Sequence, residues 1–500
     1  MNIKKNIIRS SLYSFILLLL VSLVGCTNFL SSNNPSNYTE NNFYKTAKDA
    51  QKAVNAIYSN VYPIYGIQAW MIDAVRTGIV NTHFPADAGF PSLVKAKELG
   101  NFSEHRDLST IWNSYYKGIA NANMAIAHIP NVKMNSTQKK QLLGQAHFLR
   151  AYYYFNLVRM FGKVPLLKKP VESVNSPDLE PKRSSVKSVY NLIVKDLKTA
   201  DSSDLPFNSS TGRVTDGAVK SLLSDVYLTM AGYPLKGGAK YYKLAKDEAK
   251  KVIDSGAYHL FNSYDFLKHP SYDNTGEYIF EIQFDPNNHP NNSLQEGLVP
   301  YRSGISAYSA EEGFIFATDG FVNSYQNNDK RKNAFFYHEF VSPSGDTTHF
   351  QHYYIYKFFN KDAMLNTAKS GLNWPVIRYA DVLLNYAEAS NEVSGPTPAA
   401  YQALNKVRER AGLADLSGLT QSEFRKAVWK EEYHEECIEN KIWFIMARTR
   451  KALNLSTGKF ENYVGHTFSY GITLKKPDLL FPLPQSALRT NPNLKQNPGF

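Results

Sequence analysis

Long hydrophobic runs are nearly absent from this 500-residue sequence. The run at its start, from Phe15 to Val21, is much shorter than the roughly 20 apolar residues that an α-helix needs to cross a bilayer. No later segment of the sequence approaches that length. The sequence therefore predicts that no helix remains in a membrane.

Cysteine is scarce too, with Cys26 and Cys437 as its two occurrences. Cys26 lies shortly after the apolar run, in an ending that resembles the lipobox of bacterial lipoproteins, which implies lipid attachment rather than a disulfide. Cys437 is then left without a partner. This count excludes a disulfide framework and a metal site built from cysteine ligands.

The sequence also lacks common catalytic motifs. It has no Gly-rich phosphate loop, no Gly-x-Ser-x-Gly and no His-Glu-x-x-His. Glu431 and His434 have the Glu-x-x-His spacing of di-iron proteins, but a second such pair is missing, which favours a solvated acidic helix face. His349 and His352 form a further, weaker metal candidate. We predict no catalytic residue, no metal and no cofactor.

Basic residues are in excess but not concentrated. The formal net charge is +12, yet no run of five or more lysines or arginines occurs. This pattern favours lysines that simply solvate the surface, with an acidic ligand or an anionic membrane surface as the alternative. We expect no nucleic-acid partner.

The first residues have the order of a secretion signal, with basic residues, then the apolar run, then small residues. Their ending "LVGC" resembles the lipobox of bacterial lipoproteins, which implies cleavage after Gly25 and lipidation of Cys26. Asn, Ser and Thr dominate the segment that follows, as in a flexible tether. We therefore predict a signal peptide over 1–25 and a lipidated cysteine with its tether over 26–42.

Helical patterns dominate residues 43–259. In "QLLGQAHFLRAYYYFNLVRMFGKVPLL", Leu142, Leu149 and Tyr153 fall on one apolar stripe. Segments of similar length follow, separated by short turns, with small residues where helices must approach. This arrangement suggests stacked, tetratricopeptide-like helix pairs.

Residues 260–375 differ, because long polar stretches alternate there with short strand patterns such as "EYIFEIQFD". Helices are expected to resume over 376–455, followed by a C-terminal tail over 456–500. The stretch "VIRYADVLLNYAEASNEV" predicts one helix that includes Ile377.

Thr420 and Glu423 form a capping box. It predicts the start of a single long helix that continues through Trp429 and Trp443.

Several stretches, in order, resemble the SusD/RagB-like outer-membrane lipoproteins of the Bacteroidetes. They are "FLRAYYYFNLVRMFGKVPLL", "VIRYADVLLNYAEASNEV", "ALNKVRERAGL" and "LLFPLPQSALRTNPNLKQNPGF". The resemblance implies a mainly α fold with four tetratricopeptide-like helix pairs and an irregular, loop-rich part with short strands. It also implies a non-catalytic protein that binds a nutrient, usually an oligosaccharide, and covers a TonB-dependent, SusC-like transporter.

The chain departs from the family pattern in two places. Where the family has Arg and Asp around the tryptophan of its long C-terminal helix, this chain has Ile442 and Ile445. These positions share a helix face, so we interpret the change as a joint exchange of a polar pair for an apolar one. The first acidic residue after Cys26 is Glu40, whereas acids often follow the lipidated cysteine more closely in the family.

Sugar rings are held by flat aromatic side chains and by hydrogen-bonding groups. Trp112, Trp429 and Trp443 fall in helices and are expected in the core, and Trp374 adjoins a helix pair. Scattered Gly and Pro and weak periodicity predict a first loop region over 62–107. By the resemblance, the ligand surface combines this first loop region with the irregular segment after the third helix pair. The ligand-contacting residues predicted there are Tyr62, Tyr65, Trp70, Tyr272, Tyr301, Arg302, Tyr308 and Phe314.

These observations predict a lipid-anchored, glycan-binding protein of the outer membrane, at the cell surface of a Bacteroidetes bacterium. A peptide-binding, RagB-like member is the alternative. A surface glycosidase or a purely structural helix scaffold is less favoured.

Overall fold

The computed structural model describes residues 43–65, 74–82, 91–171, 176, 179–287, 292, 294–306, 311–313, 315–367 and 369–500. The predicted signal peptide, Cys26 and the tether lie outside these ranges. Among the described helices, none is both long and apolar enough to span a bilayer.

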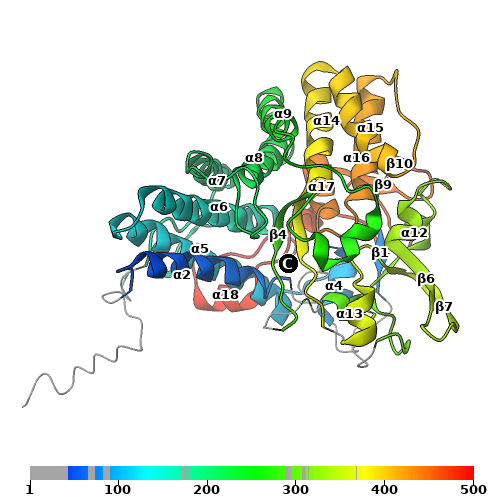
Figure 1. Cartoon of the computed structure of the whole chain (residues 1–500), viewed down its shortest axis with the longest axis horizontal. Coiled ribbons are helices and arrows are strands. Elements are labelled where there is room, and N and C mark those ends of the chain that lie inside the picture. Colours follow the sequence, from blue (N-terminus) through cyan, green and yellow to red (C-terminus); the bar gives the residue numbers. More distant parts are fainter. Residues whose placement is uncertain are drawn as a thin grey trace, which may run out of the picture.

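The first half of the chain is a row of helices in which each packs against the next (Figure 1). These are α2 (Ala47–Tyr58), α5 (Arg106–His128), α6 (Ser136–Phe161), α7 (Val186–Asp201), α8 (Asp216–Ala231) and α9 (Ala239–Asp254). The row continues after a long interruption, because α9 packs against α14 (Tyr379–Ser394). Beyond it, α14 contacts α15 (Pro398–Arg410) and α16 (Gln421–Glu435). The mainly α architecture is confirmed.

Local signals account for many helix starts. The hydroxyls of Thr46, Ser185, Thr215 and Thr420 each accept a hydrogen bond from the first turn of the helix that follows. The capping box predicted at Thr420 is confirmed. Small residues also occur where helices meet: a Cβ at Gly118 of α5 would lie 2.3 Å from the Tyr153 ring of α6.

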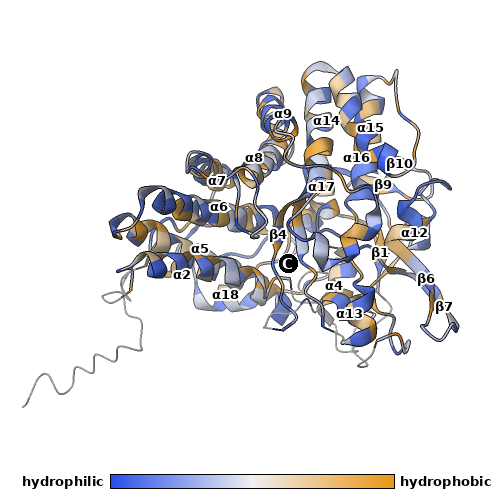
Figure 2. Ribbon diagram, in the orientation of Figure 1, coloured by the Kyte–Doolittle hydropathy of each residue, from blue (hydrophilic) through white to orange (hydrophobic). Residues whose placement is uncertain are grey.

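Apolar faces of the stacked helices turn toward one another, with polar residues outside (Figure 2). One core runs from these helices into the C-terminal half, where it includes the fully buried Trp443 and Phe481. The C-terminal tail is part of it, because the Phe481 amide donates to the Met160 carbonyl at 2.8 Å. The predicted boundaries at 259/260, 375/376 and 455/456 stay predictions.

Short antiparallel strands build the irregular part. One sheet has the order β1 (Val80–Asn81), β5 (Phe316–Ala317), β7 (Thr347–Ile355) and β6 (Phe336–Val341). The other pairs are β4 (Tyr278–Ile282) with β8 (Trp374–Arg378), β2 (Val164–Pro165) with β3 (Arg183–Ser184), and β9 (Lys451–Asn454) with β10 (Lys459–Asn462). The strand expected in "EYIFEIQFD" is β4.

Shorter helices complete the described chain. They are α4 (Pro91–Lys97), α10 (Leu294–Leu298), α11 (Asp319–Val322), α12 (Arg331–Phe335), α13 (Lys361–Asn366), α17 (Ile442–Thr449) and α18 (Gln485–Thr490). The 3₁₀ turns are Ser59–Val61, Ile129–Asn131, Tyr264–Lys268, Pro270–Tyr272 and Lys476–Leu479.

Two helix predictions are wrong. Ile377 lies on strand β8, opposite Phe280 of β4, and the helix after it begins at Tyr379. The long helix through Trp429 and Trp443 is two helices, α16 and α17, separated by 436–441. Ile438 and Asn440 adopt positive φ in that segment, and the Glu439 side chain between them contacts the buried cations Lys357 and Arg378.

Candidate functional site

The sheet brings the two predicted ligand-binding regions together. β1 belongs to the first loop region, and it pairs with β5 of the irregular segment, Val80 opposite Ala317. The Thr318 amide adds a hydrogen bond of 2.9 Å to the Ile79 carbonyl. Segments more than 230 residues apart in the sequence therefore pair within one sheet.

Tyr301 and Arg302 project from the loop after α10. The Tyr301 side chain is 49% exposed, and the Arg302 guanidinium lies 5.1 Å from the centroid of its ring. A flat ring beside a fan of N–H donors is the combination that holds a sugar ring and its hydroxyls.

A buried carboxylate fixes this loop. Glu311 accepts hydrogen bonds from the Ser303 hydroxyl at 3.1 Å, the Gly304 amide at 2.9 Å and the Ser306 amide at 2.7 Å. The backbone also closes tightly, because a Cβ at Gly313 would lie 2.7 Å from the Tyr301 nitrogen. Tyr301 and Arg302 are thus presented by a preorganised turn.

The other predicted aromatics lie deeper. Tyr62 is half-buried with its ring 5.8 Å from Phe284. Tyr65 is buried, its hydroxyl 2.7 Å from that of Tyr152 and its ring 6.5 Å from Trp374.

Tyr272 is half-buried and stacks on Phe266 with ring centroids 4.1 Å apart. Trp70, Tyr308 and Phe314 lie outside the described residues. Ligand contact by each of the eight stays a prediction.

Of the three tryptophans expected in the core, Trp112 and Trp443 are buried. Trp374, which was expected beside a helix pair, is buried too. Trp429 is half-buried and donates to Glu388 at 3.1 Å. Ile442 and Ile445 are both buried on α17, as their apolar character requires.

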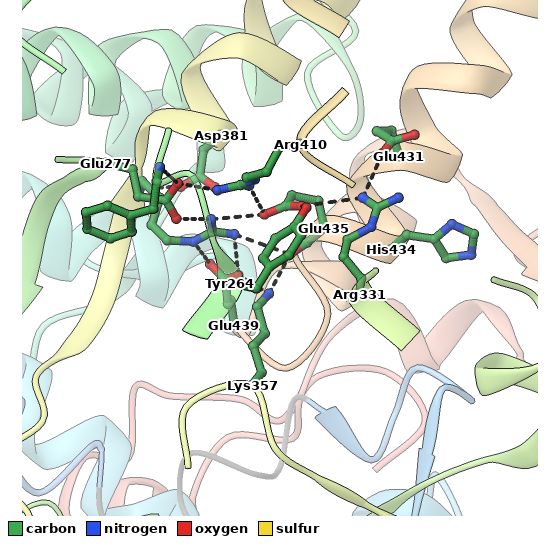
Figure 3. Close-up of polar contacts among 12 residues, drawn as sticks. Tyr264, Glu277, Arg331, Lys357, Asp381, Arg410, Glu431, His434, Glu435 and Glu439 are labelled. Carbon is green, nitrogen blue, oxygen red and sulfur yellow. Dashed lines mark hydrogen bonds and ion pairs between the residues drawn. The ribbon is translucent and has the colours of Figure 1, made fainter. Parts of the chain in front are cut away.

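A second site-like feature is a network of buried ion pairs, which we call the ion-pair cluster (Figure 3). Its cations come from four separate segments. Its carboxylates come from α16, the turn after it, the residue before β4 and the segment before α12. The cluster comprises Glu277, Asp329, Arg331, Lys357, Arg378, Arg410, Glu431, Glu435 and Glu439.

Each arginine of the cluster has several carboxylate partners. Arg378 contacts Glu277 at 2.9 Å, Glu435 at 3.0 Å and Glu439 at 2.6 Å, and all four side chains are fully buried. Arg331 and Arg410 are bound in the same way, and both contact Glu435. Burial would raise the pKa of Glu435, but Arg410, Arg378 and Arg331 outweigh it and lower the pKa to about 2.

The prediction of a solvated acidic helix face is therefore wrong. Glu431, Glu432, His434 and Glu435 are all buried. The sequence spacing places acids on α16, but the matching cations come from distant segments that spacing does not reveal.

The Glu-x-x-His pair is engaged within the protein. Glu431 pairs with Arg331 at 2.6 Å, and His434 Nε2 lies 3.0 Å from the Ser324 hydroxyl. Burial lowers the pKa of His434 well below its usual range, so the ring is neutral. Among the described residues, no group of three or more His, Cys, Asp or Glu side chains is placed to hold a metal ion.

The other histidine pair does not converge. His349 is exposed and lies 3.6 Å from Glu339 across the β6–β7 hairpin. His352 stacks on Phe316 with centroids 3.9 Å apart. Cys437 is buried, and burial raises the pKa of its thiol.

Two family models match the chain. Residues 341–500 match the model described as "SusD family", and residues 28–228 match "Starch-binding associating with outer membrane". A SusD superfamily protein of known structure, from Parabacteroides distasonis, is 36% identical with a TM-score of 0.86, covering 91% of this chain and 99% of that one. The chain belongs to the SusD family.

Other members of the SusD family are more distant. "SusD-like protein P2" of Formosa agariphila is 27% identical over 97% of this chain and 98% of its own length. A structure described as "Laminarin binding SusD-like protein" is 23% identical, with a TM-score of 0.74 over 91% of this chain and 100% of its own. The expected SusD-like fold is confirmed.

Sequence reasoning missed Glu311 and every member of the ion-pair cluster except Glu431, which it interpreted as part of a solvated helix face. Glu311 is followed by a second acidic residue and a glycine in a polar stretch. Nothing in this local sequence predicts that its side chain is buried and holds a turn. Arg378 lies within a recognised family stretch but was interpreted as helical.

Proposed function

We propose that this SusD family member is a non-catalytic lipoprotein that binds oligosaccharide at the outer membrane. The observation that carries the proposal is the exposed Tyr301 ring beside Arg302, on a turn held by the buried Glu311. The family gives further support, because its N-terminal model is described as starch-binding and associated with the outer membrane. A fold neighbour is described as laminarin-binding.

The ligand face is proposed to extend from Tyr301 and Arg302 toward the first loop region, which the pairing of β1 with β5 joins to the irregular segment. Tyr62, which is half-buried in the first loop region, is proposed as a further contact. Further contacts are proposed for Tyr65, Trp70, Tyr272, Tyr308 and Phe314.

Delivery of the bound sugar to a TonB-dependent, SusC-like transporter completes the proposal. Cys26, lipidated after cleavage behind Gly25, would hold the protein at the cell surface. Several acyl chains are sufficient for stable anchoring, because each buried CH₂ contributes about 0.8 kcal/mol.

Isothermal titration of the purified protein with a panel of oligosaccharides tests the binding function. Tyr301→Ala is expected to weaken the best ligand roughly tenfold or more, because the stacking surface is lost. Tyr301→Phe is the matched control and keeps most of the affinity, since the ring remains.

Three other results would overturn parts of the proposal. Binding of acidic peptides without any response to glycans would favour the RagB-like alternative. Release of sugar products that stops when one carboxylate is replaced would show a glycosidase. Recovery of Cys26→Ser protein in the membrane fraction to the same extent as wild type would refute the lipid anchor.

A further inference from the structure

A large cavity lies away from the Tyr301 face, between the helical stack and the C-terminal half. It measures about 670 Å³ and is lined by the ends of α6 and α8, the start of α7, the helix α17 and the C-terminal tail. This volume falls within the range of roughly 300 to 1,000 Å³ that is usual for small-molecule sites. We call it the basic cavity.

The walls of the basic cavity are mainly apolar. Val158, Tyr190 and Leu479 contribute buried side chains, and Phe444 and Ala447 line it from α17. Such a surface favours an apolar body over a fully hydroxylated one, because contact with apolar groups removes both surfaces from water.

The charges in this cavity all have one sign. Six lining residues are lysine or arginine, and no acidic residue is among those that line it within the described chain. Two of the six are neutralised nearby: Arg448 pairs with Glu388 at 2.6 Å, and Arg159 lies 3.6 Å from Asp225.

The remaining four cations form no ion pair with any described residue. They are Lys163, Arg183, Arg450 and Lys476. Lys163 and Lys476 are exposed, so water hydrates their ammonium groups, whereas Arg183 and Arg450 are half-buried.

The two half-buried arginines bind neutral groups instead of carboxylates. Arg450 donates to the Ala447 carbonyl at 2.9 Å. Arg183 donates to four acceptors, the carbonyls of Phe161, Lys163 and Lys495 and the side chain of Asn497. Burial lowers the pKa of both guanidinium groups, because partial removal from water disfavours the charged form.

Tyr233 adds an aromatic group at the same wall. Its ring is partly exposed, with Arg450 at 4.7 Å and Lys236 at 4.6 Å from the ring centroid. The Tyr233 amide donates to the Arg448 carbonyl at 2.9 Å, which ties the residue to the end of α17. The cationic groups of Arg450 and Lys236 therefore lie around an aromatic ring whose backbone is fixed by a hydrogen bond.

We propose that the basic cavity binds an amphipathic anion, a carboxylate or sulfonate carried on an apolar body. Charge complementarity favours an anionic group on the ligand, because Arg450 and Lys163 have no carboxylate partner among the described residues. The apolar lining favours an apolar body on the same ligand. This site is separate from the glycan face, so it neither requires nor is required by the glycan-binding proposal.

Anilinonaphthalene sulfonate, a fluorescent amphipathic anion, tests the site in the purified protein carrying Cys26→Ser, which has no acyl chain to compete. One saturable site is expected. Phenylnaphthylamine, which lacks the sulfonate, is expected to bind roughly tenfold or more weakly, because a charged hydrogen bond contributes enough for that factor.

Variants locate the site. Lys163→Gln with Arg450→Gln should weaken the anionic probe roughly tenfold or more while leaving the uncharged probe unchanged. Ala447→Phe, which fills the cavity, should weaken both. The matched control is Lys243→Gln with Lys250→Gln, the same charge change on exposed positions of α9.

An unchanged affinity in the cavity variant, or an equal loss in the control variant, would overturn the proposal. Lys476→Gln, at an exposed position, supplies a second test if the double variant does not fold. Displacement of the probe by decanoate would identify an aliphatic acid, and displacement by hydroxycinnamate an aromatic one. Displacement by neither would also refute the site.

Discussion

The ion-pair cluster and the basic cavity both withdraw arginines from water, but they differ in what those arginines contact. In the cluster, Arg378 has three carboxylate partners, and its side chain is completely buried. In the cavity, Arg183 and Arg450 contact neutral acceptors and remain half-buried. Complete pairing within the chain indicates a structural role, whereas incomplete pairing beside a cavity leaves room for an anion from outside.

The largest expected effect comes from breaking the cluster. Arg378→Gln should lower the free energy of unfolding by about 3 to 5 kcal/mol, because Glu277, Glu435 and Glu439 lose a buried cation together. Urea denaturation of the two proteins measures the difference. Lys250→Gln, exposed on α9, is the control, and a loss below about 1 kcal/mol for Arg378→Gln would contradict the structural role.

Acid should weaken the cluster next. The pKa of Glu435 is about 2 in the folded chain, below its value in the unfolded chain, so its stabilising effect is present above pH 5 and is lost as the pH falls toward 2. On the order of 2 to 3 kcal/mol should disappear over this range.

The free energy of unfolding is measured at several pH values for the wild type and for Glu435→Gln. The variant should be less stable at pH 5, and its free energy of unfolding should decrease less steeply as the pH falls. Burial raises the pKa of Glu432 and of Glu436, which acts in the opposite direction, so the difference between the two proteins is the informative quantity. Parallel slopes would count against the interpretation.

The equivalent change in the cavity should be mild. Arg450→Gln is expected to alter the free energy of unfolding by less than about 1 kcal/mol, because the cost of its burial offsets one hydrogen bond and its contact with Tyr233. The same urea titration measures it. A loss as large as that of Arg378→Gln would erase the distinction between the two regions.

The smallest effect is expected on the exposed loop. Tyr301→Ala should change the free energy of unfolding by no more than about 0.5 kcal/mol, since half of the side chain is in solvent and Glu311 holds the turn. Thermal unfolding checks this value. A large destabilisation would mean that any loss of glycan binding reflects misfolding.

Short-range signals predicted much of the helical scaffold. The capping box at Thr420 depends on a few neighbouring residues, and it is confirmed. Strand β8 was missed because Ile377 is extended only by pairing with β4, nearly 100 residues earlier. Glu439 was placed inside a helix because its partner Arg378 lies 61 residues away.

The same limit applies to the candidate site. Tyr301 and Arg302 were predicted from their residue type within a segment that the family resemblance implies for the ligand surface, and the structure places both at the surface. Their fixation by Glu311, and the approach of β1 to β5, depend on backbone geometry that residue type does not report.

The sequence by itself determined the mainly helical scaffold and the scarcity of known catalytic motifs, because these follow from local patterns, and it indicated the family by resemblance. Only the tertiary structure decided that Glu431 and Glu435 of α16 are buried and paired, and that four cations of the basic cavity have no carboxylate partner among the described residues. The reason is physical: the energy of a charge depends on its exposure to water and on the charges that distant segments place beside it.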